Sequence, residues 1–221
     1  MSRPVALLDL DGTLMDSASG VVSSVRAAYD HLGLPLPSEA EMRSFAGPPI
    51  GWSFPAHGVP ADRVAEAVTV YNEHFGRVGV WDTTVFEGVP EALAALREAG
   101  VLLVVATAKP LVWAEPICAE VGLTPLLDHV VGAPDDESES KGDIIGRALA
   151  WVAGTTGGEG SRAVMLGDRE HDVHGAAEHG LGCLGAGWGY GGPGELVAAG
   201  ALEVLTSPAQ VPGAVLARVG G

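Results

Sequence analysis

Residues 5–17 read Val-Ala-Leu-Leu-Asp-Leu-Asp-Gly-Thr-Leu-Met-Asp-Ser. The apolar run that opens this segment shows no polar alternation, which is typical of a central parallel strand buried on both faces. The run ends in two carboxylates, Asp9 and Asp11, and Gly12 and Thr13 then turn the chain. Because side chains in a strand alternate with a period of two, both carboxylates are expected on one side at the carboxyl end of the strand.

Two carboxylates held together repel each other unless a cation neutralises them or one of them takes up a proton. Aspartates after a core strand are common, so this pair alone does not identify a site. Further polar segments follow apolar strand patterns or begin helices, which is where open α/β sheets place their sites. They are Thr107, Lys141 and the segment Gly167-Asp168-Arg-Glu-His-Asp172.

The composition is that of a globular protein with a strong acidic excess. The chain has 221 residues, 47% of them hydrophobic, and 28 acidic residues against 12 basic ones. This length provides ample core for one large domain or two modest ones. A net charge of -16 argues against nucleic-acid and membrane partners, because anionic surfaces are bound by clustered Lys and Arg. Two cysteines without metal-ligand spacing, and no signal or membrane-spanning segment, predict a cytoplasmic protein.

Strand and helix patterns alternate after Gly88, which predicts an α/β fold with a doubly wound parallel sheet. Residues 101–106 and 163–166 are fully apolar and are expected to be buried strands. Pro116 lies within a helical pattern, and we expect it to kink that helix or delay its start. A surface turn is expected over residues 155–160.

Residues 16–84 have a different pattern, with apolar residues at helical spacing and no strand signal. The helices are expected at about 16–32, 38–45 and 61–75. We therefore predict a helical domain of residues 16–84, inserted into a core domain formed by residues 1–15 and 85–221.

The segment Asp-Leu-Asp-Gly-Thr-Leu-Met-Asp-Ser at 9–17 resembles the first motif of the haloacid dehalogenase-like (HAD) superfamily, in its phosphatase branch. Thr107 resembles the second motif of that family, and Lys141 in Ser-Lys-Gly-Asp-Ile-Ile resembles the third. Gly-Asp-Arg-Glu-His-Asp at 167–172 is similar to the fourth, in a variant found in phosphoglycolate-phosphatase-like members. Four motifs in the family's order across nearly the whole chain are far more specific than any one of them.

The resemblance implies a phosphomonoester phosphatase that works through an aspartyl-phosphate. Asp9 would be the nucleophile, and Asp11 the general acid and base. An unactivated carboxylate is a weak nucleophile, so the chemistry needs cations around the phosphate, and Lys141 would be one of them. The phosphate oxygens would be bound by residues of the first two motifs: Thr107, the backbone N–H of Ala108, and Gly12.

A metal site is predicted from the acidic residues. Asp168 and Asp172 are four residues apart across a strand-to-helix turn, so both can face a cation held opposite Asp9 and Asp11. Ligand sets made only of oxygen suit Mg²⁺ rather than zinc, so Mg²⁺ bound by these four aspartates is the predicted cofactor.

By the same resemblance, the helical insert corresponds to the mobile C1 cap of the family, which closes over the strand ends and excludes water. Arg43 and Trp52 are the substrate contacts that we predict in the cap. The substrate is expected to be a small phosphorylated metabolite, with phosphoglycolate, a 5′-nucleotide and a sugar phosphate all open. The protein is expected to be a monomer or a homodimer.

Several alternatives stand beside this interpretation. Phosphosugar mutases of the superfamily carry a histidine near the position of Val21, so a mutase is the weaker alternative. A non-catalytic phosphometabolite-binding relative would require a lost motif residue, and none is lost. Lys109 is an alternative to Lys141 as the cation beside Asp9 and the phosphoryl group. His171 is interpreted as structural. The Gly-rich segment 187–192 fits a dinucleotide-binding pattern but lacks its acidic partner, and we expect it to border the site.

Overall fold

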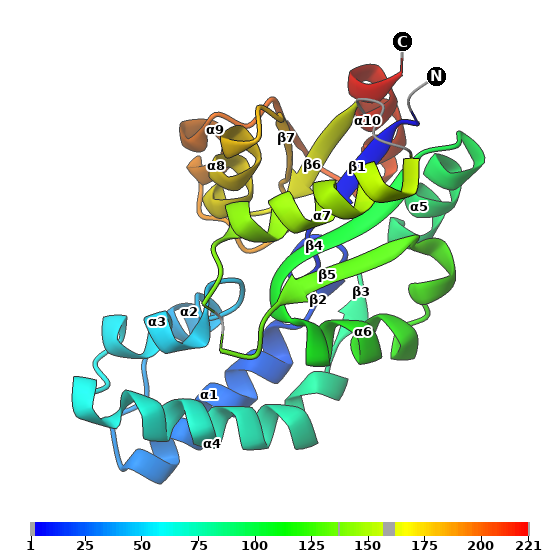
Figure 1. Ribbon diagram of the computed structural model, residues 1–221. Coiled ribbons are helices and arrows are strands. Elements are labelled where there is room, and N and C mark those ends of the chain that lie inside the picture. Colours follow the sequence, from blue (N-terminus) through cyan, green and yellow to red (C-terminus); the bar gives the residue numbers. More distant parts are fainter. Residues whose placement is uncertain (1–2, 137, 157–161, 221) are drawn as a thin grey trace.

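The computed structural model describes residues 3–136, 138–156 and 162–220 (Figure 1). Its main sheet has the strand order β5-β4-β1-β6-β7-β8, and every neighbouring pair is parallel. The predicted doubly wound α/β fold is therefore confirmed. The strands are β1 (Val5–Leu8), β4 (Leu102–Pro110), β5 (His129–Ala133), β6 (Ala163–Gly167), β7 (Cys183–Ala186) and β8 (Glu203–Leu205).

Strand β1 lies in the middle of the sheet and is completely buried. Ala6 and Leu8 pack into one apolar cluster and Val5 and Leu7 into another, so the two sides of the strand face two separate helical layers. Each buried aliphatic side chain of this size contributes roughly 1.5–3 kcal/mol to folding. The continuous apolar run thus places β1, and the carboxylates after it, at the centre of the molecule.

The helices of the core cover both faces of the sheet. Among these core helices, one group contributes residues to the cluster of Ala6 and Leu8, which also extends into the helices of residues 18–77, and a second group contributes to the cluster of Val5 and Leu7. The first group is α5 (Val89–Glu98), α6 (Leu111–Glu120) and α10 (Val211–Val219); the second is α7 (Lys141–Thr156), α8 (Glu170–Glu178) and α9 (Glu195–Ala199).

The remaining helices form a separate group away from the sheet (Figure 1). They are α1 (Ala18–Leu32), α2 (Glu39–Arg43), α3 (Ile50–Ala56) and α4 (Val64–Arg77), with short 3₁₀ turns at Ala61–Arg63 and Gly79–Trp81. Aromatic side chains fill the interior of this group. Phe45 and Phe54 meet edge to face at 5.5 Å between ring centroids, and Tyr71 stacks on Phe75 at 5.5 Å.

Two short strands mark the crossings between the helical group and the core. β2 (Met15–Asp16) pairs antiparallel with β3 (Thr84–Val85), where the sequence pattern indicated no strand. Each strand has only two residues, which is too short to leave an alternating signal. The division into a core and a cap at residues 16 and 84 stays a prediction, and this pairing joins the two ends of the predicted cap.

Two local expectations are corrected. The strand expected at 101–106 extends to Pro110, with a register shift between Thr107 and Pro110. Of the two effects expected of Pro116, the delayed start is absent, because α6 begins at Leu111 and Pro116 lies inside it; the kink stays a prediction. The surface turn expected at 155–160 falls outside the described residues from 157 onward, and residues 155–156 end α7. Within the described residues, no helix combines the length and apolarity needed to cross a bilayer.

Candidate active site

The turn after β1 fixes the position of both aspartates. The backbone N–H of Asp9 donates to the carbonyl of Leu166 at 2.9 Å, so Asp9 is still held beside β6. Gly12 then adopts a φ of 78°, which favours glycine. A Cβ at Gly12 would lie 2.2 Å from Asp168 Oδ2. The turn therefore requires glycine at this position on steric grounds, and the predicted role of Gly12 in substrate binding stays a prediction.

Three buried carboxylates form a compact cluster. One carboxylate oxygen each from Asp9, Asp168 and Asp172 lies within 4.8 Å of the others. Burial raises the pKa of Asp9 to about 7, and burial together with the charge of Asp9 raises the pKa of Asp168 well above its usual value. Because desolvation and mutual repulsion disfavour several ionised carboxylates in one place, the cluster is suited to a cation. The ligands are all oxygen, which fits the predicted Mg²⁺.

Neighbouring groups orient these carboxylates. Asp168, at the end of β6, accepts hydrogen bonds from the Thr13 hydroxyl at 3.2 Å and from the backbone N–H of Tyr190 at 2.7 Å. Asp172, in the first turn of α8, accepts from the backbone N–H of Arg169 at 3.1 Å. Such outer contacts fix ligand orientation at metal sites.

Asp11 does not join the cluster. Its carboxylate accepts a hydrogen bond from the Ser17 hydroxyl and pairs with the Lys109 ammonium, Oδ2 lying 3.0 Å from Nζ. The prediction that the Asp11 carboxylate shares the metal site with Asp9 is corrected, because β1 ends at Leu8 and the strand period no longer applies at Asp11.

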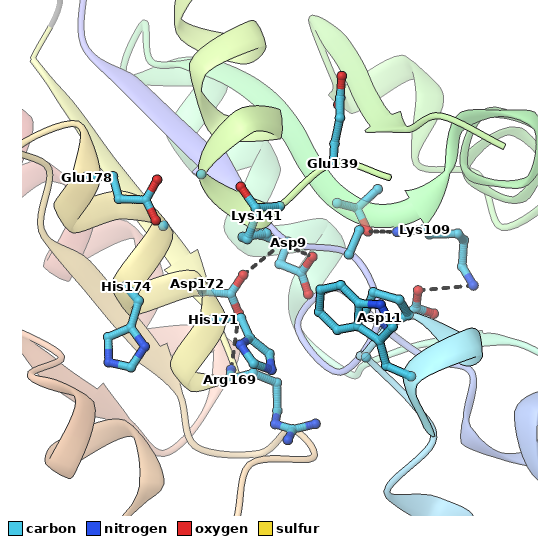
Figure 2. Close-up of a pocket in the computed structure, with 18 residues that line it drawn as sticks. Asp9, Asp11, Lys109, Glu139, Lys141, Arg169, His171, Asp172, His174 and Glu178 are labelled. Atoms are coloured by element: carbon cyan, nitrogen blue, oxygen red, sulfur yellow. Dashed lines mark hydrogen bonds and ion pairs between the residues drawn. The ribbon is translucent and has the colours of Figure 1, made fainter. Parts of the chain in front are cut away.

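Lys141, at the start of α7, stands between two carboxylates of the cluster (Figure 2). Its Nζ lies 2.5 Å from Asp9 Oδ1 and 2.7 Å from Asp172 Oδ1. Burial alone would lower the pKa of Lys141, but the carboxylates of Asp172 and Asp9 raise it above its usual value. The ammonium therefore stays charged next to Asp9.

Lys109 has different partners. Besides its pair with Asp11, its Nζ lies 4.8 Å from the centroid of the Phe75 ring on α4. The sequence contains no lysines other than Lys109 and Lys141, and both line the same cavity. The two lysines therefore contact different aspartates: Lys141 pairs with Asp9 and Asp172 of the carboxylate cluster, and Lys109 pairs with the predicted acid, Asp11.

A cavity of about 170 Å³ opens over Asp9 and Asp11, between the carboxyl end of the sheet and the segment from Gly47 to Trp52 that leads into α3. Figure 2 shows side chains that line it. The predicted residues Asp9, Asp11, Thr107, Ala108, Lys141 and Trp52 line it. A second cavity of about 50 Å³ shares Asp11, Ala108 and Lys109 with the first and is walled by aromatic rings. Those rings belong to Phe45, Tyr71, Phe75 and Trp113.

One expectation about the rim is corrected, and one residue was missed. Arg43 is exposed at the end of α2 and lines neither cavity, because Met42 is the residue of that helix that points inward. His171 is exposed and lines the cavity, and its interpretation as structural stays a prediction. Arg169 was missed: its guanidinium contacts Glu195 Oε1 at 2.8 Å and the carbonyl of Ala46 at 3.3 Å. Its only sequence signal is its place inside the fourth motif.

The Gly-rich segment 187–192 borders the site, as expected. The Trp188 indole N–H donates to the carbonyl of Thr13 at 3.0 Å. Tyr190 contacts Asp168 through its backbone and Asp16 and Ser17 through its hydroxyl. The segment therefore packs against both the carboxylate cluster and the first crossing into the helical group.

Comparison with known proteins gives consistent matches. Residues 6–186 match the family model described as haloacid dehalogenase-like hydrolase. The tyrosine-protein kinase PtkA of Mycobacterium tuberculosis is 39% identical over 86% of this chain and 64% of its own length. A 5′-nucleotidase of Pseudomonas aeruginosa is 36% identical over 87% of this chain and 86% of its own. The crystal structure of a predicted phosphatase from Clostridium acetobutylicum superposes with a TM-score of 0.88 at 30% identity, covering 98% of this chain and 100% of that one. The chain thus spans less than two thirds of the length of the kinase relative.

Proposed function

Because the chain belongs to the haloacid dehalogenase-like hydrolase family, we propose that it is a Mg²⁺-dependent phosphomonoester phosphatase acting on small phosphorylated metabolites through an aspartyl-phosphate. One observation carries the proposal. Asp9 lies directly after the carboxyl end of the central strand, with the Lys141 ammonium 2.5 Å from one of its oxygens and two further buried carboxylates beside it. The Asp9 carboxylate can therefore act as a nucleophile beside a fixed cation and a suitable metal site.

The residues divide the reaction between them. Asp9 forms a bond to phosphorus as the bond from phosphorus to the ester oxygen breaks, and Asp11 gives its proton to the departing oxygen. Asp11 then takes a proton from the water that attacks the aspartyl-phosphate, which releases phosphate and restores Asp9. Lys141 and Thr107 bind the phosphoryl oxygens, whose charge must be balanced throughout. Mg²⁺, held by Asp9, Asp168 and Asp172, would add positive charge at the same oxygens.

The test is turnover of a panel of phosphate esters. We expect hydrolysis of p-nitrophenyl phosphate and of at least one of phosphoglycolate, a 5′-nucleotide and a sugar phosphate, measured as released phosphate. We expect a chelator to abolish this turnover and added Mg²⁺ to restore it. No turnover of any ester with Mg²⁺ present, by protein that is folded by circular dichroism, would contradict the proposal.

A second candidate is transfer of the phosphoryl group to a protein tyrosine, because a relative 39% identical to this chain is named a tyrosine-protein kinase. An aspartyl-phosphate can in principle be attacked by a hydroxyl as well as by water. Labelled ATP and a tyrosine-containing polypeptide distinguish the two: label on tyrosine supports the kinase, and label recovered only as phosphate supports the phosphatase.

Trp52 of the predicted cap is expected to influence which ester is preferred. Trp52 is 64% exposed and lines the larger cavity, so it can contact the organic part of a substrate without touching the phosphate cluster. We expect Trp52→Ala to lower kcat/KM for the preferred metabolite by more than roughly fivefold, which is about 1 kcal/mol. Hydrolysis of the small ester p-nitrophenyl phosphate should change much less.

Trp81→Ala is the matched control. Trp81 is 52% exposed in the same helical group and lines neither cavity, so its loss should leave both esters unaffected. Equal losses on both esters with Trp52→Ala would show that Trp52 does not set specificity.

A further inference from the structure

The hydroxyl of Tyr190 occupies the junction between the Gly-rich segment 187–192 and the first crossing into the helical group. It accepts the backbone N–H of Ser17 at 2.8 Å and donates to Asp16 Oδ1, also at 2.8 Å. Burial and the nearby carboxylates of Asp11 and Asp16 raise the pKa of Tyr190 above its usual value, so the phenol keeps the proton that it donates. The hydroxyl thus holds the crossing at two adjacent residues, through the side chain of Asp16 and the backbone of Ser17.

Ser17 uses its side chain in an unusual way for its position. It is the N-cap residue of α1, where a serine hydroxyl normally accepts an N–H from the first turn. Here the hydroxyl makes no such bond and donates instead to Asp11 Oδ1, and Ser17 is completely buried. Asp16 takes over the capping, because its Oδ1 accepts the N–H of Ala18 at 3.0 Å. The Ser17 hydroxyl is therefore committed to Asp11.

The other side of the tyrosine is equally fixed. Its backbone N–H donates to Asp168 Oδ2 at 2.7 Å, and a Cβ on Gly12 would lie 2.8 Å from its ring. Tyr190 therefore makes two separate contacts. Its backbone N–H binds Asp168, a predicted metal ligand, and its hydroxyl binds the backbone N–H of Ser17, whose own hydroxyl binds Asp11. These two links use different atoms, so a substitution can separate them.

We propose that Tyr190 is a positioning residue for Asp11: its hydroxyl fixes the Ser17 backbone so that the Ser17 hydroxyl orients the carboxylate of the general acid. The proposal rests on the proposed phosphatase function, in which Asp11 protonates the departing oxygen. The Gly-rich segment would thus contribute to acid catalysis. Removal of the Tyr190 hydroxyl should not disturb the carboxylate cluster of Asp9, Asp168 and Asp172.

The first test is the dependence of Tyr190→Phe on the departing group. An alkyl alkoxide must be protonated as it leaves, whereas nitrophenolate leaves without a proton, and kcat/KM reports the steps up to that departure. We expect Tyr190→Phe to lower kcat/KM roughly tenfold for an alkyl phosphate and less than roughly twofold for p-nitrophenyl phosphate. Tenfold is about the smallest loss typical when a residue that orients a functional side chain is substituted. The Mg²⁺ concentration for half-maximal activity should stay unchanged, because the N–H bond to Asp168 remains.

The second test is a double-mutant cycle with Ser17→Ala. That substitution removes the hydroxyl but keeps the N–H that Tyr190 binds. If Tyr190 acts through the Ser17 hydroxyl, Tyr190→Phe should cause little further loss in the Ser17→Ala background. Tyr29→Phe is the matched control: it removes one phenol bond, to the carbonyl of His57 at 2.9 Å, from the helical group alone.

The third test needs no activity. The Ser17 amide proton is held by the Tyr190 hydroxyl, so its hydrogen exchange, measured by NMR, should be at least roughly tenfold faster in Tyr190→Phe and unchanged in Tyr29→Phe. An unchanged Ser17 exchange rate, equal losses on alkyl and aryl esters, or losses that multiply fully in the double variant would each overturn the proposal. A wild-type protein inert toward both esters would instead refute the phosphatase function, and the exchange measurement would still decide whether Tyr190 holds Ser17.

Discussion

Asp9→Asn is expected to lower kcat for phosphate-ester hydrolysis by roughly 10⁴-fold or more, as loss of a covalent nucleophile does in other enzymes. An amide nitrogen or oxygen does not form the acyl-phosphate, and an amide is a weaker ligand for a hard cation than a carboxylate. Asparagine has nearly the same shape as aspartate, so the loss of turnover reports the missing chemical step and not a change in packing. The measurement is steady-state release of phosphate at saturating Mg²⁺, together with a search for labelled enzyme after denaturation.

The protein should remain folded in this variant. Burial raises the pKa of Asp9 from its usual 3.8 to about 7, so the stability that the protonated carboxyl contributes is lost as the pH rises between these two values and is absent above about 7. A neutral amide avoids this loss, and the thermal midpoint at pH 8 without Mg²⁺ should be equal or higher. Asp30→Asn, an exposed change on α1, should leave turnover unchanged. Near-native turnover of pure Asp9→Asn would rule out the covalent mechanism.

The second large effect is expected at Lys141. Its ammonium is the only side-chain cation that the structure places directly on the carboxylates of Asp9 and Asp172 within the described residues. Lys141→Met should lower kcat/KM by roughly 10²–10³-fold, because a fixed charge at the phosphoryl group is lost. It should also lower the free energy of unfolding by roughly 3–5 kcal/mol, because buried carboxylates lose their partner.

Lys109→Met is the matched comparison, since it replaces the other lysine in the same cavity by the same residue. Lys109 pairs with Asp11, and within the described residues no ion pair joins it to Asp9, Asp168 or Asp172. We therefore expect a smaller loss for p-nitrophenyl phosphate than Lys141→Met causes. If the two substitutions gave the same loss on that ester, the separate roles of the two lysines would be wrong.

Much of the site follows from the sequence because it depends on strand ends. A fully apolar strand such as residues 5–8 must lie inside the sheet, and parallel strands bring their carboxyl ends to one edge. Asp9 and Thr107 therefore meet in space although nearly a hundred residues separate them. Lys141 and Asp172 begin helices that pack on the same sheet, which accounts for their place beside Asp9.

The errors concern side-chain direction where no regular element sets it. Asp11 follows the end of β1, so the alternation of a strand does not orient it, and Ser17 and Lys109 do. Arg43 ends a helix of five residues, which is too short for an apolar stripe to define its inner face. The contacts of Tyr190 with Ser17 and Asp168 join residues far apart in sequence, and no local pattern encodes them.

The placement of the lysines has a consequence for the chemical labelling of this protein. Lys109 and Lys141 are the only residues with an ammonium side chain, and their side chains are 7% and 8% exposed in ion pairs within the cavity. A protonated, paired amine reacts slowly with acylating reagents. Acetylation or carbamylation of a lysine therefore reports access to the cavity itself, and each modified lysine removes a positive charge from Asp9 or Asp11.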